Sequence, residues 1–183
     1  MDSLATDIFI RCQRGDRDAF RVVVQTYQRL VFSLAIKMLA DEDDAKDIAQ
    51  ETFIRVWQGI DSYDVRRPFA TWIYAIASRL CLDRIKGKKH TAPLPQDELA
   101  LQQFASEADN ERSLENSEYV AIVQALTEKL SPKQRLVFTL CQLEGLSSDE
   151  VEQIAGLNAR QVKSNLYEAR QTIREQLKLL GYE

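Results

Sequence analysis

The segment SSDEVEQIAGLNARQVKSNLYEARQTIREQL, residues 147–177, contains two helix starts and one helix end in close succession. Two pairs of residues in it have the spacing of N-terminal capping boxes, namely Ser147 with Glu150 and Asn158 with Gln161. Gly156 stands where the first helix would end, because glycine readily adopts the left-handed conformation that closes helices. The segment therefore predicts a short helix, a tight turn and a longer helix, which is the pattern of a helix-turn-helix.

The second of these helices carries a polar face suited to DNA. Between Ala159 and Lys178 five basic residues outnumber two acidic ones, and the apolar residues lie on the opposite side. Many helical hairpins bind no DNA, so the hairpin alone leaves a structural role open. The hydrogen-bond donors on this face favour recognition of a duplex in its major groove. The predicted contacts are Arg160, Gln161, Lys163, Ser164, Asn165, Tyr167, Arg170 and Arg174.

Upstream of the hairpin, apolar residues that recur every three or four positions predict a helical bundle. Its long helices cover residues 19–39, 41–59 and 68–86, and a shorter helix near residues 7–13 packs across them. From Gly87 onward Pro, Ser and Asn are mixed with many acidic residues, which predicts a linker. The acidic half of this linker either keeps the chain soluble or binds a partner.

The predicted fold is all-α, with two small helical domains joined by a flexible linker. The first domain is an N-terminal helical bundle over 1–89, the acidic linker covers 90–117, and the C-terminal helix-turn-helix domain covers 118–183. Two further helices, over 120–130 and from Pro132 to near Gly145, precede the hairpin in the second domain.

The third long helix of the bundle combines basic and aromatic residues. Tyr63, Trp72 and Tyr74 lie on or near it, and its end is basic. Exposed rings stack on unpaired bases while cations follow the phosphates, so the pattern suits single-stranded nucleic acid. For Trp72, which has helical spacing with Phe69 and Ile76, a place in the core is the commoner role. The basic residues are Arg79, Arg84, Lys86, Lys88 and Lys89.

The second long helix is acidic outside its apolar stripe. Asp44, Asp47 and Glu51 lie there with Gln50, Arg55 and Gln58, and Ile54 is expected to be exposed among them. An acidic face repels DNA. It is therefore either a solvated surface or a docking surface for a basic protein partner.

Composition excludes several classes of protein. The net charge of -4 argues against a protein that binds DNA by bulk electrostatics alone. No secretory signal and no apolar run near the ~18 residues of a membrane span are found, so we expect a cytoplasmic protein without membrane insertion. Cys12, Cys81 and Cys141 are far apart and have apolar neighbours, which is typical of reduced core thiols.

The sequence also contains no set of residues typical of catalysis. His90 is the only histidine, and it lies in a basic stretch without a nucleophile or carboxylate at motif spacing. No glycine-rich phosphate loop occurs. We therefore expect that the protein is not an enzyme and uses no cofactor and no metal.

Four segments, in order, resemble one protein family. They are DAFRVVVQTYQRLVFSLA (18–35), DEDDAKDIAQETFIRVWQGI (41–60), RPFATWIYAIASRLCLDRIK (67–86) and the C-terminal stretch from Leu130 to Leu177. Together they resemble the extracytoplasmic-function (ECF) branch of the bacterial sigma-70 family of RNA polymerase sigma factors. The resemblance implies promoter-specific transcription initiation, with region 2 in the first domain and region 4 in the second.

The resemblance also implies a role for each surface and a set of partners. The partners would be core RNA polymerase, promoter DNA and an anti-sigma factor. Core polymerase would be bound by Asp44, Asp47, Gln50, Glu51, Ile54 and Arg55. The −10 element would be melted and read by Tyr63, Arg66, Arg67, Trp72, Tyr74, Ser78, Arg79, Arg84 and Lys86. The −35 element would be read by the polar face of residues 160–174.

The sequence departs from the family pattern at several positions, and two rival interpretations stay open. Ser78-Arg79 stands where relatives usually have Arg-Asn, and Asn165 and Glu168 occupy positions that are usually basic. The promoter sequence therefore cannot be carried over. The rivals are a stand-alone helix-turn-helix regulator and a sigma mimic that sequesters another regulator.

Overall fold

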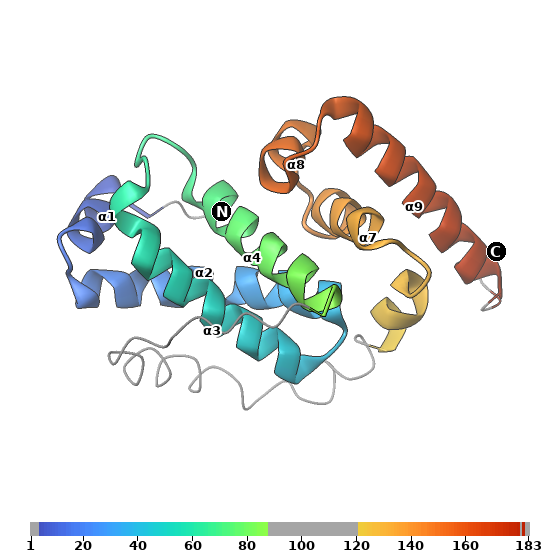
Figure 1. Cartoon of the computed structure of the whole chain (residues 1–183), viewed down its shortest axis with the longest axis horizontal. Coiled ribbons are helices and arrows are strands. Elements are labelled where there is room, and N and C mark those ends of the chain that lie inside the picture. The colour runs from blue at the N-terminus through green and yellow to red at the C-terminus, as the bar shows by residue number, and fades with distance from the viewer. Residues whose placement is uncertain (1–3, 88–120, 180, 182–183) are drawn as a thin grey trace.

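The computed structural model describes residues 4–87, 121–179 and 181, and every regular element in those ranges is helical (Figure 1). The first part of the chain contains α1 (Thr6–Gln13), α2 (Arg17–Leu39), α3 (Glu42–Gly59), the short turn η1 (Ile60–Ser62) and α4 (Phe69–Ile85). The second part contains a helical segment over 121–127, then α7 (Pro132–Phe138), η2 (Thr139–Leu143), α8 (Ser148–Ala155) and α9 (Ala159–Leu179). The predicted all-α class is confirmed, whereas the predicted linker, with Lys88, Lys89 and His90, lies almost entirely outside the described residues.

Local side-chain hydrogen bonds fix the helix ends of the second part. Ser131 and Ser147 each form a reciprocal capping box, with Gln134 and Glu150 respectively. Gly156 closes α8 in the left-handed conformation with φ 64°, as its position in the sequence predicts. Each of these bonds satisfies a backbone group that a helix end leaves unpaired, so the sequence determines where the turn of the helix-turn-helix lies.

The first part is a bundle in which α2 packs against α3 and α4 while α1 crosses α2. Its core contains the large, fully buried side chains of Leu34, Met38, Ile73 and Leu80. Asp16 begins α2 by accepting hydrogen bonds from the backbone N–H groups of Asp18 and Ala19. These four helices hold the loop over 60–68 and the start of α4 at one end of the bundle.

The helix after Pro132 does not remain an α-helix to its end. From Thr139 to Leu143 it widens into a π-helical turn, in which the Glu144 N–H donates to the Thr139 carbonyl at 2.9 Å. Gly145, with φ 70°, then ends the segment. Such wide turns occur often at functional positions, and this one determines where Glu144 lies.

The two parts of the chain pack against each other. Helix α8 lies along α4, and α7 also contacts α4 (Figure 1). Val137, Leu140 and Val151 belong to the same hydrophobic cluster as Val31, Leu34 and the other core residues of the bundle. A smaller cluster around Leu130, Ala169 and Ile173 belongs to the second part alone. The two predicted helical domains are both present, and in this structure their hydrophobic cores are continuous.

Candidate nucleic-acid interface

The exposed face of α9 holds the residues expected to read duplex DNA. Seven of these side chains are exposed, and the ring of Tyr167 is 63% exposed. The seven are Arg160, Gln161, Lys163, Ser164, Tyr167, Arg170 and Arg174. Asn165 is only partly exposed, and its side-chain amide donates to the Gln161 carbonyl at 2.8 Å. The cations are therefore exposed, although the Arg170 guanidinium donates to the Gln142 side-chain oxygen at 3.1 Å, and Asn165 must exchange an internal hydrogen bond before it can contact a base.

Glu168 places a carboxylate on the same helix. It accepts hydrogen bonds from the Gln134 side-chain amide at 2.7 Å and from the Ser164 hydroxyl at 3.0 Å. The bond from Gln134 joins α9 to the start of α7, and the bond from Ser164 lies within α9. Glu168 therefore helps to hold α9 against α7. An acceptor at this position also selects against a phosphate close by, because the two negative charges repel.

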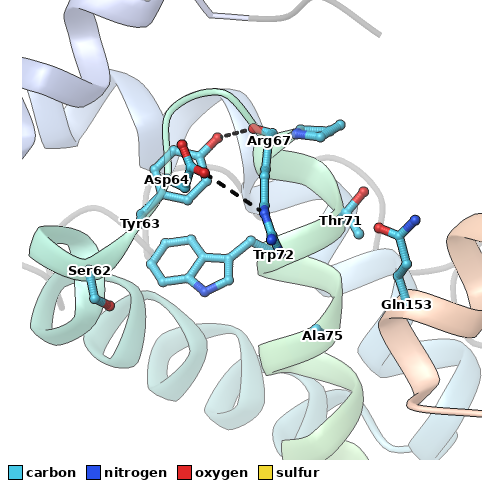
Figure 2. A pocket seen from close by; sticks show the side chains of 9 residues that line it. Ser62, Tyr63, Asp64, Arg67, Thr71, Trp72, Ala75 and Gln153 are labelled. Carbon is cyan, nitrogen blue, oxygen red and sulfur yellow. Dashed lines mark hydrogen bonds and ion pairs between the residues drawn. The ribbon is translucent and has the colours of Figure 1, made fainter.

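A pocket opens where the loop over 60–68 meets the start of α4 (Figure 2). The rings of Tyr63 and Trp72 stack along its floor with centroids 4.9 Å apart and planes inclined by 20°. The Tyr63 hydroxyl donates to the Arg67 carbonyl, and Gln13 donates to the carbonyls of Ile60 and Tyr63 at 3.0 and 2.8 Å. The loop is thus anchored at several points. Tyr63 is only 6% exposed, because it packs among Phe9, Phe69 and Trp72, so the expectation that its ring contacts DNA is wrong. Trp72 is partly exposed, and its ring can stack on an unpaired base.

Charged groups surround the pocket. Asp64 accepts two hydrogen bonds from the Arg66 guanidinium at 2.9 and 3.0 Å. These bonds hold the pKa of the Asp64 carboxyl well below its usual range, at about 2. Arg66 and Arg67 remain largely exposed. The sequence predicts Tyr63, Arg66, Arg67 and Trp72 here but misses Gln13, Asp64 and Gln153, of which only Asp64, a typical loop residue, gives a local signal.

The structure places Tyr74 and Ser78 out of reach of DNA, which corrects the expectation that both are accessible. Tyr74 is 1% exposed and Ser78 is 2% exposed, because the second part of the chain packs over this face of α4. The Tyr74 hydroxyl donates to Glu144 at 2.8 Å. Burial and this carboxylate raise the pKa of the Tyr74 hydroxyl strongly. Arg79 and Lys86 are exposed, as expected.

The acidic face of α3 is available apart from one residue. Asp47 is exposed, and Glu51 forms an ion pair with Arg55 at 2.7 Å. Ile54 is 5% exposed, so the expectation that it is exposed is wrong. Apolar spacing identifies the side of a helix that faces its own bundle, and it cannot detect burial on another side.

Arg84 joins the two predicted surfaces of the first part. Its guanidinium forms ion pairs with Asp44 and, at 3.6 Å, with Asp47 on α3. A residue expected to contact DNA is therefore paired with residues expected to contact a protein partner.

The described residues contain neither a metal-binding cluster nor a membrane-spanning helix. In residues 4–87 and 121–179, no group of three or more His, Cys, Asp or Glu side chains is arranged to hold a metal ion. In the same part of the chain, no helix has the length and apolar character that spanning a membrane requires.

Comparison with known proteins identifies the family. Residues 23–91 match the family model for sigma-70 region 2, and residues 121–173 match that for sigma-70 region 4. The ECF RNA polymerase sigma factor SigW of Bacillus subtilis is 34% identical over 91% of this chain and 92% of its own length. The chain belongs to the ECF sigma factors. It is thus an RNA polymerase sigma factor, which directs promoter-specific initiation by binding core polymerase and reading −10 and −35 elements.

Solved structures agree with this fold. CnrH, solved in complex with the cytosolic domain of CnrY, has a TM-score of 0.71 at 21% identity and covers 95% of this sigma factor. The sigma factor RpoE of Bartonella quintana, solved with the anti-sigma factor NepR, has a TM-score of 0.63 at 20% identity and covers 87%. Helix α4 and the pocket residues 62–75 lie within the matched region 2, whereas Gln153 of the pocket, α8 and most of α9 lie within the matched region 4.

Proposed function

We propose that this sigma factor reads the −35 element as duplex with the exposed face of α9. The observation that carries this assignment is the row of exposed cations, Arg160, Lys163, Arg170 and Arg174, on the helix that follows the capped turn. Arg and Lys pair with guanine edges and with phosphates, so the row can supply both specificity and position.

The assignment of α9 is tested by replacing the first cations of the helix. Arg160→Ala and Lys163→Ala should each weaken use of the −35 element, since one good base contact is worth about 1–3 kcal/mol. The assay is run-off transcription with core RNA polymerase on paired templates that contain or lack the −35 element. Lys178→Ala, an exposed cation near the end of α9, is the matched control. Equal loss on both templates would assign these residues another role.

The −10 element is assigned to the pocket beside Trp72 and to the exposed part of α4. A base that leaves the duplex can stack on the Trp72 ring, which Tyr63 supports from below, and the exposed Arg66 and Arg67 beside it can bind phosphates. Arg79 and Lys86 extend the same positive surface toward the end of α4. Tyr74 and Ser78 join this surface only when the second part of the chain moves away from α4.

Core polymerase is assigned to the outer face of α3. Asp47 and Glu51, with Asp44, Gln50 and Arg55 beside them, present acidic groups to a basic partner. Asp47→Lys and Glu51→Lys should each weaken binding of core polymerase, which fluorescence anisotropy of the labelled sigma factor measures. Glu175→Lys, an equal charge change on exposed α9, should leave the affinity unchanged. If neither charge reversal on α3 changed the affinity for core polymerase, the docking surface would lie elsewhere.

The remaining assignments follow from the same family. We assign region 2 to residues 1–89, the linker to 90–117 and region 4 to 118–183. The chain acts by binding rather than by catalysis of its own, and it works with core polymerase in the cytoplasm. Because one solved structural neighbour is bound to an anti-sigma factor, we also assign a regulator of that kind to this chain.

A further inference from the structure

Glu144 lies at the seam between the two parts of the chain, and its carboxylate is almost fully enclosed. One oxygen accepts hydrogen bonds from the Lys37 ammonium at 2.6 Å and from the Ser33 hydroxyl at 3.1 Å, both on α2. The other oxygen accepts from the Tyr74 hydroxyl at 2.8 Å, on α4. The Glu144 and Lys37 side chains are only 11% and 13% exposed. A single side chain of region 4 thus binds two helices of region 2.

The local backbone directs Glu144 into this seam. The π-helical turn before it and the left-handed Gly145 after it both depart from regular helix. The Leu146 N–H then donates to the Leu140 carbonyl at 3.0 Å, which fixes the return of the chain toward α8. The π-helical turn and Gly145 together fix the position of Glu144 at the seam.

The contacts around Glu144 cover the surface assigned to the −10 element. Tyr74, the partner of Glu144, and Ser78 one turn later are both buried by the packing of region 4 on α4. Gln153 of α8 lines the pocket of Tyr63 and Trp72 and points toward it from across α4 (Figure 2). A single-stranded DNA therefore cannot occupy the full surface while α8 lies on α4.

The seam also contains polar groups that lose hydrogen bonds to water when the two parts of the chain pack together. The hydroxyl oxygens of Ser78 and Thr139 are buried without a hydrogen-bond partner among the described residues. Each such group loses its water on closing and receives no bond in return. Against these groups, the closed arrangement is held by the hydrophobic core that the two parts share, by the hydrogen bonds of Glu144 and by the bond from Arg135 to the Met38 carbonyl.

We propose that Glu144 is an intramolecular latch that keeps this sigma factor closed and its −10 surface covered until region 4 leaves region 2. The proposal rests on the −10 surface assigned above. Helix α3 packs against α2, α4 and η1, and it has no extensive contact with the described helices of region 4. Among the described residues, region 4 does not pack on the outer face of α3 and Asp47 there is exposed, so core polymerase can bind first and opening can follow.

A thiol placed in the seam tests the latch in the full-length chain. In Ser78→Cys the new thiol replaces a hydroxyl without a partner, so the substitution removes no hydrogen bond. Its rate of reaction with iodoacetamide measures the open fraction, even when that fraction is small. Tryptic peptides separate position 78 from Cys81, because Arg79 lies between them. Adding Glu144→Gln should increase the rate about tenfold or more, since three bonds to a charged group are weakened.

Controls separate opening from unfolding. Glu175→Gln, at an exposed carboxylate of α9, should leave the rate at position 78 unchanged. Cys81 is fully buried in region 2 and reports global unfolding. An unchanged rate at position 78 in Glu144→Gln, or an equal increase at Cys81, would overturn the latch. A rise confined to position 78 supports it.

The labelling assay contains neither polymerase nor DNA, so its outcome is independent of the proposed function. Transcription from genomic fragments with core polymerase tests that function separately. If no variant initiates transcripts, the assignment of the −10 surface fails even where labelling shows the latch. If transcripts form but labelling is unaffected by Glu144→Gln, the latch fails and the promoter assignment remains.

Discussion

Arg135 ties three segments of the chain together, and its replacement by Met should have a measurable cost. One guanidinium nitrogen donates to the Met38 carbonyl near the end of α2 at 3.0 Å, and another donates to the Thr127 carbonyl at 2.8 Å. The first bond crosses between the two parts of the chain, and the second lies within region 4. Methionine retains much of the length of the apolar stem, so Arg135→Met removes the charge and both bonds while leaving most of the packing.

The magnitude follows from what is gained and lost. Two hydrogen bonds from a charged donor contribute about 3–6 kcal/mol before any cost is subtracted. Burial lowers the pKa of the Arg135 guanidinium, and its Nε is buried without a partner, so the charge is not fully compensated. An unsatisfied buried donor costs about 1–3 kcal/mol. The Thr127 carbonyl keeps a second donor, the Leu130 N–H. We therefore expect a net loss of about 2 kcal/mol in the free energy of unfolding.

Circular dichroism at 222 nm during heating measures this loss. For a chain of this length, about 2 kcal/mol lowers Tm by about 4–8 °C. Lys133→Met removes the same charge from an exposed position on α7 and should shift Tm by less than about 2 °C. A Tm for Arg135→Met that is indistinguishable from that of Lys133→Met would refute the reasoning, because the two bonds of Arg135 would then contribute nothing.

Three further predictions concern single residues. The Glu150 carboxyl accepts hydrogen bonds in its capping box, which lower its pKa below the ordinary 4.5, so its stabilisation is present above about pH 4.5 and is lost as the pH falls through the lowered pKa. Glu150→Gln should therefore make the free energy of unfolding fall less steeply as the pH is lowered, which urea unfolding between about pH 3 and about pH 6 measures. Ala40 ends α2 with φ 53°, so Ala40→Gly should raise Tm by about 2–4 °C, whereas Ala125→Gly within a helix should lower it. Burial raises the pKa of the Cys81 thiol to about 12, so mass spectrometry at pH 8 should show Cys141 alkylated well before Cys81.

The ends of the helices were predictable because their causes are local. Ser147, Glu150 and Gly156 lie within a few residues of the backbone groups they satisfy, and the structure shows the expected bonds. The exposed face of α9 follows from the same boundaries, since a known helix start fixes which residues share a side. Sequence spacing thus locates α9 and the exposed face that carries most of the predicted −35 contacts.

Contacts between distant segments were not predictable from spacing. Tyr74 and Ser78 have the polar atoms expected of a DNA surface, but region 4 covers them, and that packing depends on residues about seventy positions away. The spacing of residues 132–145 predicts a continuous helix and gives no sign of the π-helical turn that places Glu144. A buried carboxylate with three donors looks in the sequence like any other acidic residue after a helix.

The closed seam accounts for how an acidic sigma factor avoids reading promoters alone. If the open form is only a fraction of the population, the apparent affinity for single-stranded DNA is reduced by that same fraction. A tenfold preference for the closed form therefore costs about 1.4 kcal/mol of apparent binding free energy, comparable to one base contact. In the docking proposed above, core polymerase that binds α3 and favours separated regions removes this cost before DNA is read. The proposed latch therefore makes promoter selection depend on polymerase through one carboxylate of region 4.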